Sequence, residues 1–265
     1  MNAAAAGALP SRVLLTGASR GIGAAIARRL LSEGVRLAVA GREPRALEAL
    51  VGVGSGHAVL SADLASRDQA EVLADRAAAA LGGLDGFVSC AGVVEYAPLG
   101  AISADSLERQ MAVNFTAPFL IAQRAAEHMA GQGGGVMLLI ASTLGIEPAP
   151  LTAAYAASKA ALISMTRSFA LEFASRAVRV NAIAPGVVDT DMVRVLRPPA
   201  TSGTPEAEAA DTAEQLERLR QLHPLGRLGR PEDVAETAEY LLRAPFVTGT
   251  VVLVDGGLTL GTGRP

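Results

Sequence analysis

The stretch Thr16-Gly17-Ala18-Ser19-Arg20-Gly21-Ile22-Gly23 decides the fold of this 265-residue chain. It follows a short apolar run, Val13-Leu14-Leu15, which is typical of a buried strand, and it opens a helical pattern over about 21–33. Glycines let the backbone turn tightly and approach a ligand closely. The helix N-terminus beyond them presents N–H groups and the positive end of a dipole. The stretch therefore predicts a strand–turn–helix unit that holds the pyrophosphate of a dinucleotide, although its spacing, G-x-x-x-G-x-G, differs from the commoner G-x-G-x-x-G.

Short apolar runs alternate with helical patterns along the rest of the chain. The predicted strands cover roughly 13–15, 36–40, 58–61, 85–89, 136–141, 178–183 and 250–254. The predicted helices cover roughly 21–33, 46–51, 69–81, 106–129, 152–174 and 231–242. Such alternation indicates right-handed crossovers and a parallel sheet covered on both faces. We therefore expect a single α/β domain over 11–265, a doubly wound Rossmann sheet of about seven strands, with ligands at the carboxyl ends of the strands.

Two segments fall outside this alternation. Residues 1–10 are rich in alanine and are expected to form a flexible N-terminal tail; they lack the basic start and long apolar core of a signal peptide. Residues 193–224 contain Pro198-Pro199 and an acidic alanine-rich run, with only 218–222 compatible with a short helix. A long insertion without strong periodicity is typical of a lid or a disordered segment. We expect a substrate lid at about 190–224, with disorder as the alternative.

Composition excludes several classes of function. A net charge of −3, the absence of tryptophan and the scatter of arginines argue against a nucleic-acid partner. No uncharged apolar run reaches the length of about 18 residues that a membrane span needs. The single cysteine, Cys90, cannot form an internal disulfide, and we interpret it as a small buried residue of a cytoplasmic protein. His57, His128 and His223 lack the spacing of metal ligands, so no metal is expected.

Tyr155 and Lys159 stand four residues apart in a predicted helix, which places both side chains on one face. Lys159 is the only lysine among 23 basic residues. An ammonium near a phenol lowers the phenol pKa from about 10, which makes the group a usable acid or base. Ser142, at the end of a predicted strand, offers a hydroxyl to a substrate oxygen. Taken singly, Ser142 is also compatible with a turn or cap, and Tyr155 with a core position.

With these residues the sequence resembles the short-chain dehydrogenases/reductases, from about Arg12 to Leu260. The glycine stretch is similar to the cofactor motif of that family, and Ser142, Tyr155 and Lys159 match its catalytic set in identity and spacing. Further matches are Asn114 as a fourth catalytic position, the segment 181–190 that holds the nicotinamide, and the signature Asp255-Gly256-Gly257.

One departure from the family pattern follows the fourth predicted strand. The family usually has Asn-Asn-Ala-Gly there, whereas this chain has Ser89-Cys90-Ala91-Gly92. We expect the backbone turn to remain because Ala91 and Gly92 are kept. The side-chain hydrogen bonds of the two asparagine positions are lost or altered, which affects local rigidity of the sheet more than activity.

The resemblance implies hydride transfer between a nicotinamide and a carbonyl or carbinol carbon. Ser142 would orient the substrate oxygen and Tyr155 would exchange the proton. Lys159 would lower the phenol pKa and bind ribose hydroxyls, and Asn114 would hold a water that links Lys159 to solvent. The implied cofactor-binding residues are Gly17, Ser19, Arg20, Gly21, Ile22, Gly23, Arg42, Asp63, Leu64, Ala91, Gly92, Tyr155, Lys159, Pro185, Gly186, Val188, Thr190 and Met192. The expected substrate pocket comprises Val94, Leu144, Val187, Met192 and Leu196.

Charge predicts which dinucleotide binds. Relatives that prefer NAD usually carry an acidic residue just after the second strand, but here Gly41 stands there and Arg42 follows. Arg20 lies inside the glycine turn, and two guanidiniums suit a 2′-phosphate, which arginine binds through two parallel bonds. We expect NADP(H) rather than NAD(H), with Asp63 on the adenine amine. The alternative is that both arginines are solvated surface residues.

Preference for NADPH favours reduction of a ketone, and an apolar pocket suits a medium-sized, partly hydrophobic one. Reductases of 3-oxoacyl groups on acyl carrier protein usually dock the acidic carrier with basic residues, which 127–135 and Leu171 do not supply. The long 193–224 insertion and the C-terminal residues resemble dehydrogenases of cyclic diols, which favour NAD. Both readings stay open as alternatives, as does a non-catalytic dinucleotide sensor. The family commonly forms tetramers, so a homo-oligomer, tetramer or dimer, is expected.

Overall fold

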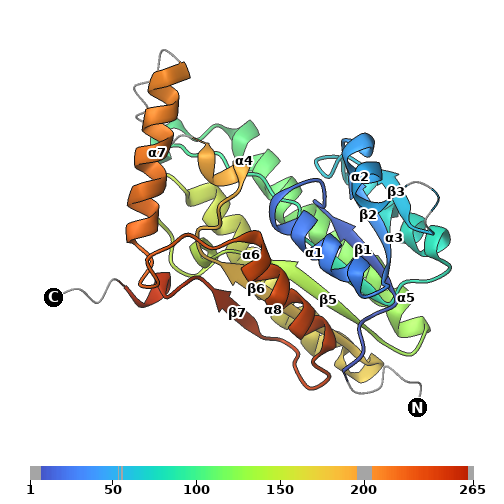
Figure 1. Cartoon of the computed structure of the whole chain (residues 1–265). Coiled ribbons are helices and arrows are strands. Elements are labelled where there is room, and N and C mark those ends of the chain that lie inside the picture. The colour runs from blue at the N-terminus through green and yellow to red at the C-terminus, as the bar shows by residue number, and fades with distance from the viewer. Residues whose placement is uncertain (1–6, 53, 55, 196–204, 262–265) are drawn as a thin grey trace.

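The computed structural model describes residues 7–52, 54, 56–195 and 205–261. These residues form one sheet of seven parallel strands in the order β3-β2-β1-β4-β5-β6-β7 (Figure 1). The strands are β1 (Arg12–Thr16), β2 (Arg36–Gly41), β3 (Ala58–Ser61), β4 (Gly86–Ser89), β5 (Gly135–Ile140), β6 (Val178–Pro185) and β7 (Val251–Val254). The strand order reverses between β1 and β4, which is where a doubly wound sheet opens a crevice. The predicted fold class is confirmed.

Helices cover both faces of this sheet (Figure 1). Successive side chains of a strand point to opposite faces, so Val13 and Leu15 join one hydrophobic cluster and Leu14 the other. The first cluster includes residues of α1 (Gly21–Ser32), α2 (Pro44–Val51) and α8 (Pro231–Arg243). The second includes residues of α3 (Arg67–Leu81), α5 (Ala117–Gly131) and α6 (Ala153–Phe173). Every residue of β1 after Arg12 is fully buried, as expected of the central strand of a covered sheet.

The helix predicted over 106–129 is present but not regular. It starts earlier, as α4 (Ala104–Met111), where the Ser103 hydroxyl accepts a hydrogen bond from the amide of Ser106. A π-helical turn, Ala112–Thr116, separates α4 from α5. Such turns interrupt the regular hydrogen-bond ladder and occur often at functional sites. Here the turn contains Asn114, which is completely buried.

The prediction for 193–224 was wrong about secondary structure. Instead of a short helix over 218–222, the structure has α7 (Pro205–Gln221), which stands apart from the two helical layers at one end of the molecule (Figure 1). The segment is rich in alanine, glutamate, glutamine and arginine, which favour helix regardless of an apolar stripe. Ion pairs between Glu214 and Arg218 and between Glu217 and Arg220 add local support. Apolar periodicity was weak because, over 211–221, Leu219 is the only buried residue.

Of the predicted N-terminal tail, residues 1–6 lie outside the described part of the chain. Leu9 packs against the hydrophobic cluster that contains α1, and the Pro10 ring approaches Gly86 of β4. Among the described residues, no helix combines the length and the apolar character needed to cross a membrane.

Candidate active site

A crevice of about 460 Å³ opens at the carboxyl ends of the central strands. The glycine turn after β1 and the chain segments after β4, β5 and β6 line it. Every residue predicted to contact the cofactor lines this crevice, as do four of the five predicted substrate-pocket residues: Val94, Leu144, Val187 and Met192. The fifth, Leu196, lies outside the described residues.

Two glycines of the turn stand where neighbouring backbone packs too closely for a side chain. Gly17 has a φ of +74°, and a Cβ at this residue would lie 2.5 Å from the backbone N of Ala91. A Cβ at Gly23 would collide with the backbone O of Gly17. Arg20 occupies the N-cap of α1 without a side-chain hydrogen bond, so the first N–H groups of the helix have no such cap. This cradle of bare N–H groups fits a pyrophosphate.

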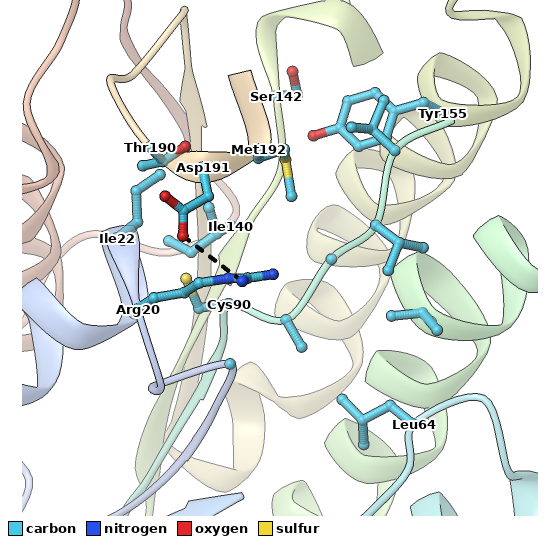
Figure 2. A pocket seen from close by; sticks show the side chains of 18 of the residues that line it. Arg20, Ile22, Leu64, Cys90, Ile140, Ser142, Tyr155, Thr190, Asp191 and Met192 are labelled. Carbon is cyan, nitrogen blue, oxygen red and sulfur yellow. Dashed lines mark ion pairs between the residues drawn. The ribbon is translucent and has the colours of Figure 1, made fainter. Parts of the chain in front are cut away.

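Tyr155, Lys159 and Ser142 come together on the opposite wall. The first two extend from one face of α6, with the Lys159 Nζ 5.7 Å from the centre of the Tyr155 ring. The Nζ donates a 2.8 Å hydrogen bond to the Ile140 carbonyl oxygen, at the end of β5. Ser142 follows two residues later, and Figure 2 shows the Tyr155 hydroxyl directed into the crevice on the side of Ser142. All three side chains are buried, with Tyr155 and Ser142 8% exposed and Lys159 4% exposed.

The electrostatics of this group differ from the sequence-based expectation. Burial raises the pKa of Tyr155 above the usual phenol value, and hydrogen bonding with the Ser142 side chain only partly opposes the increase. Burial also lowers the pKa of Lys159 from 10.5 to about 8. The prediction that the phenol pKa is lowered is therefore wrong for this structure, because the loss of water around the phenol outweighs the hydrogen bond with Ser142. The phenol stays protonated at neutral pH, which suits a proton donor.

Asn114 lies behind the crevice wall. Its Nδ2 donates to the Val93 carbonyl oxygen and to the Ser158 Oγ, and its Oδ1 accepts from the Val93 N–H. Ser158 in turn donates to the Tyr155 carbonyl oxygen at 2.6 Å. In this structure the side chain thus braces the segment after β4 against α6. Both amide protons of Asn114 already bond to protein groups. The predicted role of Asn114 as the holder of a water stays a prediction.

The Ser89-Cys90 departure lies beside the end of β1 in the sheet. Ser89 is paired in register with Thr16 of β1, and the Thr16 hydroxyl is buried with no hydrogen-bond partner among the described residues. The Cys90 amide donates to the Thr16 carbonyl oxygen, so the backbone turn is kept, as expected. Burial raises the pKa of the Cys90 thiol to about 12, against the pull of Lys159, which makes it a poor nucleophile.

The two arginines predicted to bind a 2′-phosphate lie differently. Arg42 lines the crevice after β2. Arg20 reaches across the crevice toward Asp191, with an ion pair of 3.6 Å, as the dashed line in Figure 2 shows. Both side chains of this pair are largely exposed, so it is weak and open to exchange of partners.

The segment 185–190, which follows β6, is held from behind by the C-terminal signature. The Gly186 amide donates to the Val254 carbonyl oxygen, and a Cβ at Gly186 would lie 2.9 Å from the Cα of Asp255. The Asp255 carboxylate accepts from the amides of Gly257 and Thr259, which closes a tight turn. This close packing explains why glycine stands at 186 and why the signature carries an aspartate.

Other crevice residues stand outside the motifs and were missed from the sequence. They include Tyr96, Arg109, Val113, Ile140, Ala141, Asp191 and Val193. Ile140 and Ala141 directly precede Ser142 at a strand end, so their place was available from the strand prediction. Arg109 of α4 reaches the crevice only because the fold brings α4 beside the segment after β4, where it pairs with Glu95 at 2.6 Å.

Comparison with known proteins agrees with this architecture. A family model described as Enoyl-(Acyl carrier protein) reductase matches residues 17–259. The 3beta-hydroxysteroid dehydrogenase 1 of Eggerthella lenta is 36% identical over 259 residues, covering 95% of this chain and 94% of the relative. The cis-4-hydroxycyclohexanecarboxylate dehydrogenase of Sinomonas cyclohexanicum is 35% identical over 257 residues, covering 93% and 95%.

Solved structures match over nearly the full length. The aldohexose dehydrogenase of Thermoplasma acidophilum superposes with a TM-score of 0.85 at 27% identity, covering 97% of each chain. A candidate NAD(P) dependent gluconate 5-dehydrogenase from Beutenbergia cavernae, with NADP bound at low occupancy, has a TM-score of 0.83 at 32% identity and covers 96% and 98%. The chain therefore belongs to the short-chain dehydrogenase/reductase family of oxidoreductases.

Proposed function

We propose that the protein is an NADP(H)-dependent reductase that converts a ketone to a secondary alcohol. The observation that carries this proposal is the buried Tyr155 beside Ser142 and Lys159, on the wall that faces the glycine cradle. A bound nicotinamide dinucleotide supplies the hydride in this family. The chain's own residues supply placement, exclusion of water and the proton.

Each residue of the catalytic group has a separate task in this proposal. The Ser142 hydroxyl holds the substrate oxygen close to the Tyr155 hydroxyl, which donates its proton to that oxygen as negative charge develops there. Lys159 stabilises the phenolate left behind and hands on a proton, for which a pKa of about 8 is well suited. Asn114 acts indirectly, by holding the segment after β4 against α6.

The preference for NADP(H) rests on Arg20 and Arg42, which line the crevice where no carboxylate follows β2 directly. A 2′-phosphate would draw Arg20 away from its exposed pair with Asp191. The test is to measure NADPH and NADH binding to the purified protein by the fluorescence of the reduced cofactors. An NADPH affinity at least tenfold higher is expected, and equal or reversed affinities would refute the preference.

The substrate half of the crevice supports a medium-sized, partly hydrophobic ketone. Val94, Leu144, Val187 and Met192 offer apolar contacts there. The two curated relatives act, by name, on a hydroxyl of a steroid and of a cyclohexane ring, so we propose an alicyclic ketone. A panel of cyclic and linear ketones with NADPH tests this point. We further propose that α7 covers the substrate, since it contacts Val193 at the rim.

The catalytic assignment is tested with Tyr155→Phe, which removes the hydroxyl and keeps the ring. We expect kcat to fall at least about a hundredfold, within the range of general acid–base catalysis, while NADPH binding changes little. Tyr240→Phe, on the exposed side of α8, is the matched control and should behave as wild type. Near-normal turnover by Tyr155→Phe would disprove the assignment.

We also propose that the chain assembles into a homodimer or homotetramer. Several large apolar side chains are exposed on α6 and around the edge strand β7; they are Leu171, Phe246, Leu253 and Leu260. Such exposure is typical of surfaces that bind a partner. Sedimentation velocity at micromolar concentration should give a dimer or tetramer, and a monomer would refute the proposal.

A further inference from the structure

His223 is one of few buried polar side chains outside the catalytic group, at 3% exposed. It lies just beyond the end of α7, and its two ring nitrogens contact different parts of the molecule. Nε2 is 3.3 Å from the backbone N of Val187, in the segment after β6. Nδ1 is 2.8 Å from the carbonyl oxygen of Leu219, in the last turn of α7.

These two partners define the chemical state of the ring. A backbone N–H can only donate, so Nε2 must accept from Val187 and carries no proton. A carbonyl oxygen can only accept, so Nδ1 must carry the proton and donate to Leu219. His223 is therefore a neutral imidazole of one tautomer, and both of its nitrogens are occupied.

The Val187 contact matters because of where this residue stands. Its neighbours Pro185, Gly186 and Val188 line the crevice, and its own carbonyl oxygen accepts from the Gly229 amide. The Gly186 amide is held by Val254. Among the described residues, His223 is thus the only side chain that hydrogen-bonds to the backbone of 185–187, and without it the partly buried Val187 N–H would lose this partner.

The same ring connects this wall of the crevice to α7. The Leu219 side chain is 5% exposed, and Gln215, one turn earlier, donates through Nε2 to the carbonyl oxygens of Val193 and Val195. Helix α7 is therefore attached to the crevice at two points. Gln215 attaches it to the rim after the 3₁₀ turn Asp191–Arg194, and His223 attaches it to the wall itself.

We propose that His223 is a positioning residue for the reaction. It positions the backbone of 185–188, against which the reacting end of the dinucleotide must lie. It also attaches α7 to the same wall, so that the helix covering the substrate site and the wall that holds the cofactor keep a fixed relative position. The inference rests on the proposed reductase function for its kinetic part only.

The two bonds can be removed separately. His223→Gln offers a side-chain carbonyl where Nε2 was, which can accept from Val187, but it loses the bond to Leu219. His223→Asn offers an amide N–H where Nδ1 was, but it leaves the Val187 N–H unpaired. The matched control is His57→Asn, because the His57 Nδ1 also accepts a backbone N–H, from Leu37, at the edge of the sheet away from the crevice.

Steady-state kinetics with NADPH and a ketone should separate the variants. For His223→Asn we expect kcat to fall about tenfold, because the partly buried Val187 N–H loses its partner and the wall shifts, with little change in the Kd for NADPH. For His223→Gln we expect kcat within about twofold of wild type and a several-fold higher KM for the ketone, since α7 is loosened. The inference is overturned if both variants match wild type, or if the two lose kcat equally.

Amide hydrogen exchange tests the bracing without any turnover. The peptide containing Val187 should exchange at least about fivefold faster in His223→Asn than in wild type. It should stay protected in His223→Gln and in His57→Asn. Unchanged exchange in His223→Asn refutes the inference. If the variants show the expected exchange pattern but the wild-type protein reduces no ketone, only the proposed function is refuted.

Discussion

Replacing Lys159 by methionine should make the folded protein more stable at neutral pH, because the ammonium is buried at 4% exposed and has no carboxylate partner among its described contacts. Burial lowers its pKa from 10.5 to about 8. A shift of that size corresponds to a penalty of about 3 kcal/mol at pH 7. The variant also loses the hydrogen bond to Ile140, which reduces the gain in stability by about 1 kcal/mol. Lys159→Met is therefore expected to gain about 2 kcal/mol at pH 7.

The dependence of this gain on pH identifies its cause. The folded protein binds the Lys159 proton less tightly than the unfolded chain, so the penalty is complete below about pH 8 and fades as the pH rises toward 10.5. Between pH 7 and pH 9 the difference between variant and wild type should shrink by about 1 kcal/mol. The raised pKa values of Cys90 and Tyr155 change the free energy of unfolding mainly above pH 9, outside this pH range.

Urea unfolding followed by circular dichroism, at pH 7 and at pH 9, measures both free energies. Arg36→Met, which removes an exposed cation at the start of β2, is the control and should show the same pH dependence as wild type. If the difference between Lys159→Met and wild type is the same at both pH values, the ammonium is not destabilised by burial, and the reasoning fails.

Three further outcomes follow from the same structure. Thr16→Val removes a buried hydroxyl without a partner and should stabilise the protein by about 1 kcal/mol in thermal unfolding, whereas a loss of stability would mean that the hydroxyl is satisfied. Gly23→Ala should abolish measurable NADPH binding and cost about 1–3 kcal/mol, because its Cβ collides with the Gly17 carbonyl oxygen; intact binding would contradict the cradle. Asp191→Asn frees Arg20 and should raise NADPH affinity up to about fivefold in fluorescence titration while leaving NADH affinity unchanged, and an equal effect on both cofactors would exclude competition with a 2′-phosphate.

The order of strands and helices was predictable because each short apolar run and each helical pattern is a local property of the chain. The prediction failed where local signals are weak. Helix α7 was missed because Leu219 is the only buried residue over 211–221, and only the propensity of its residues indicated it. The π-helical turn around Asn114 was missed because its backbone distortion leaves no mark in apolar periodicity.

The site divides in the same way. The glycine turn, Ser142, Tyr155 and Lys159 could be placed in the crevice from the sequence, since they stand at strand ends or on one helix face, whereas Tyr96 and Arg109 could not. Only the tertiary structure decided their electrostatics, because the depth of burial raises the pKa of Tyr155 and lowers that of Lys159. It also decided the contacts of His223, which bonds to Val187, 36 positions away in the chain. Spacing along the chain predicts neighbours on one element, whereas desolvation and long-range hydrogen bonds depend on how the elements pack.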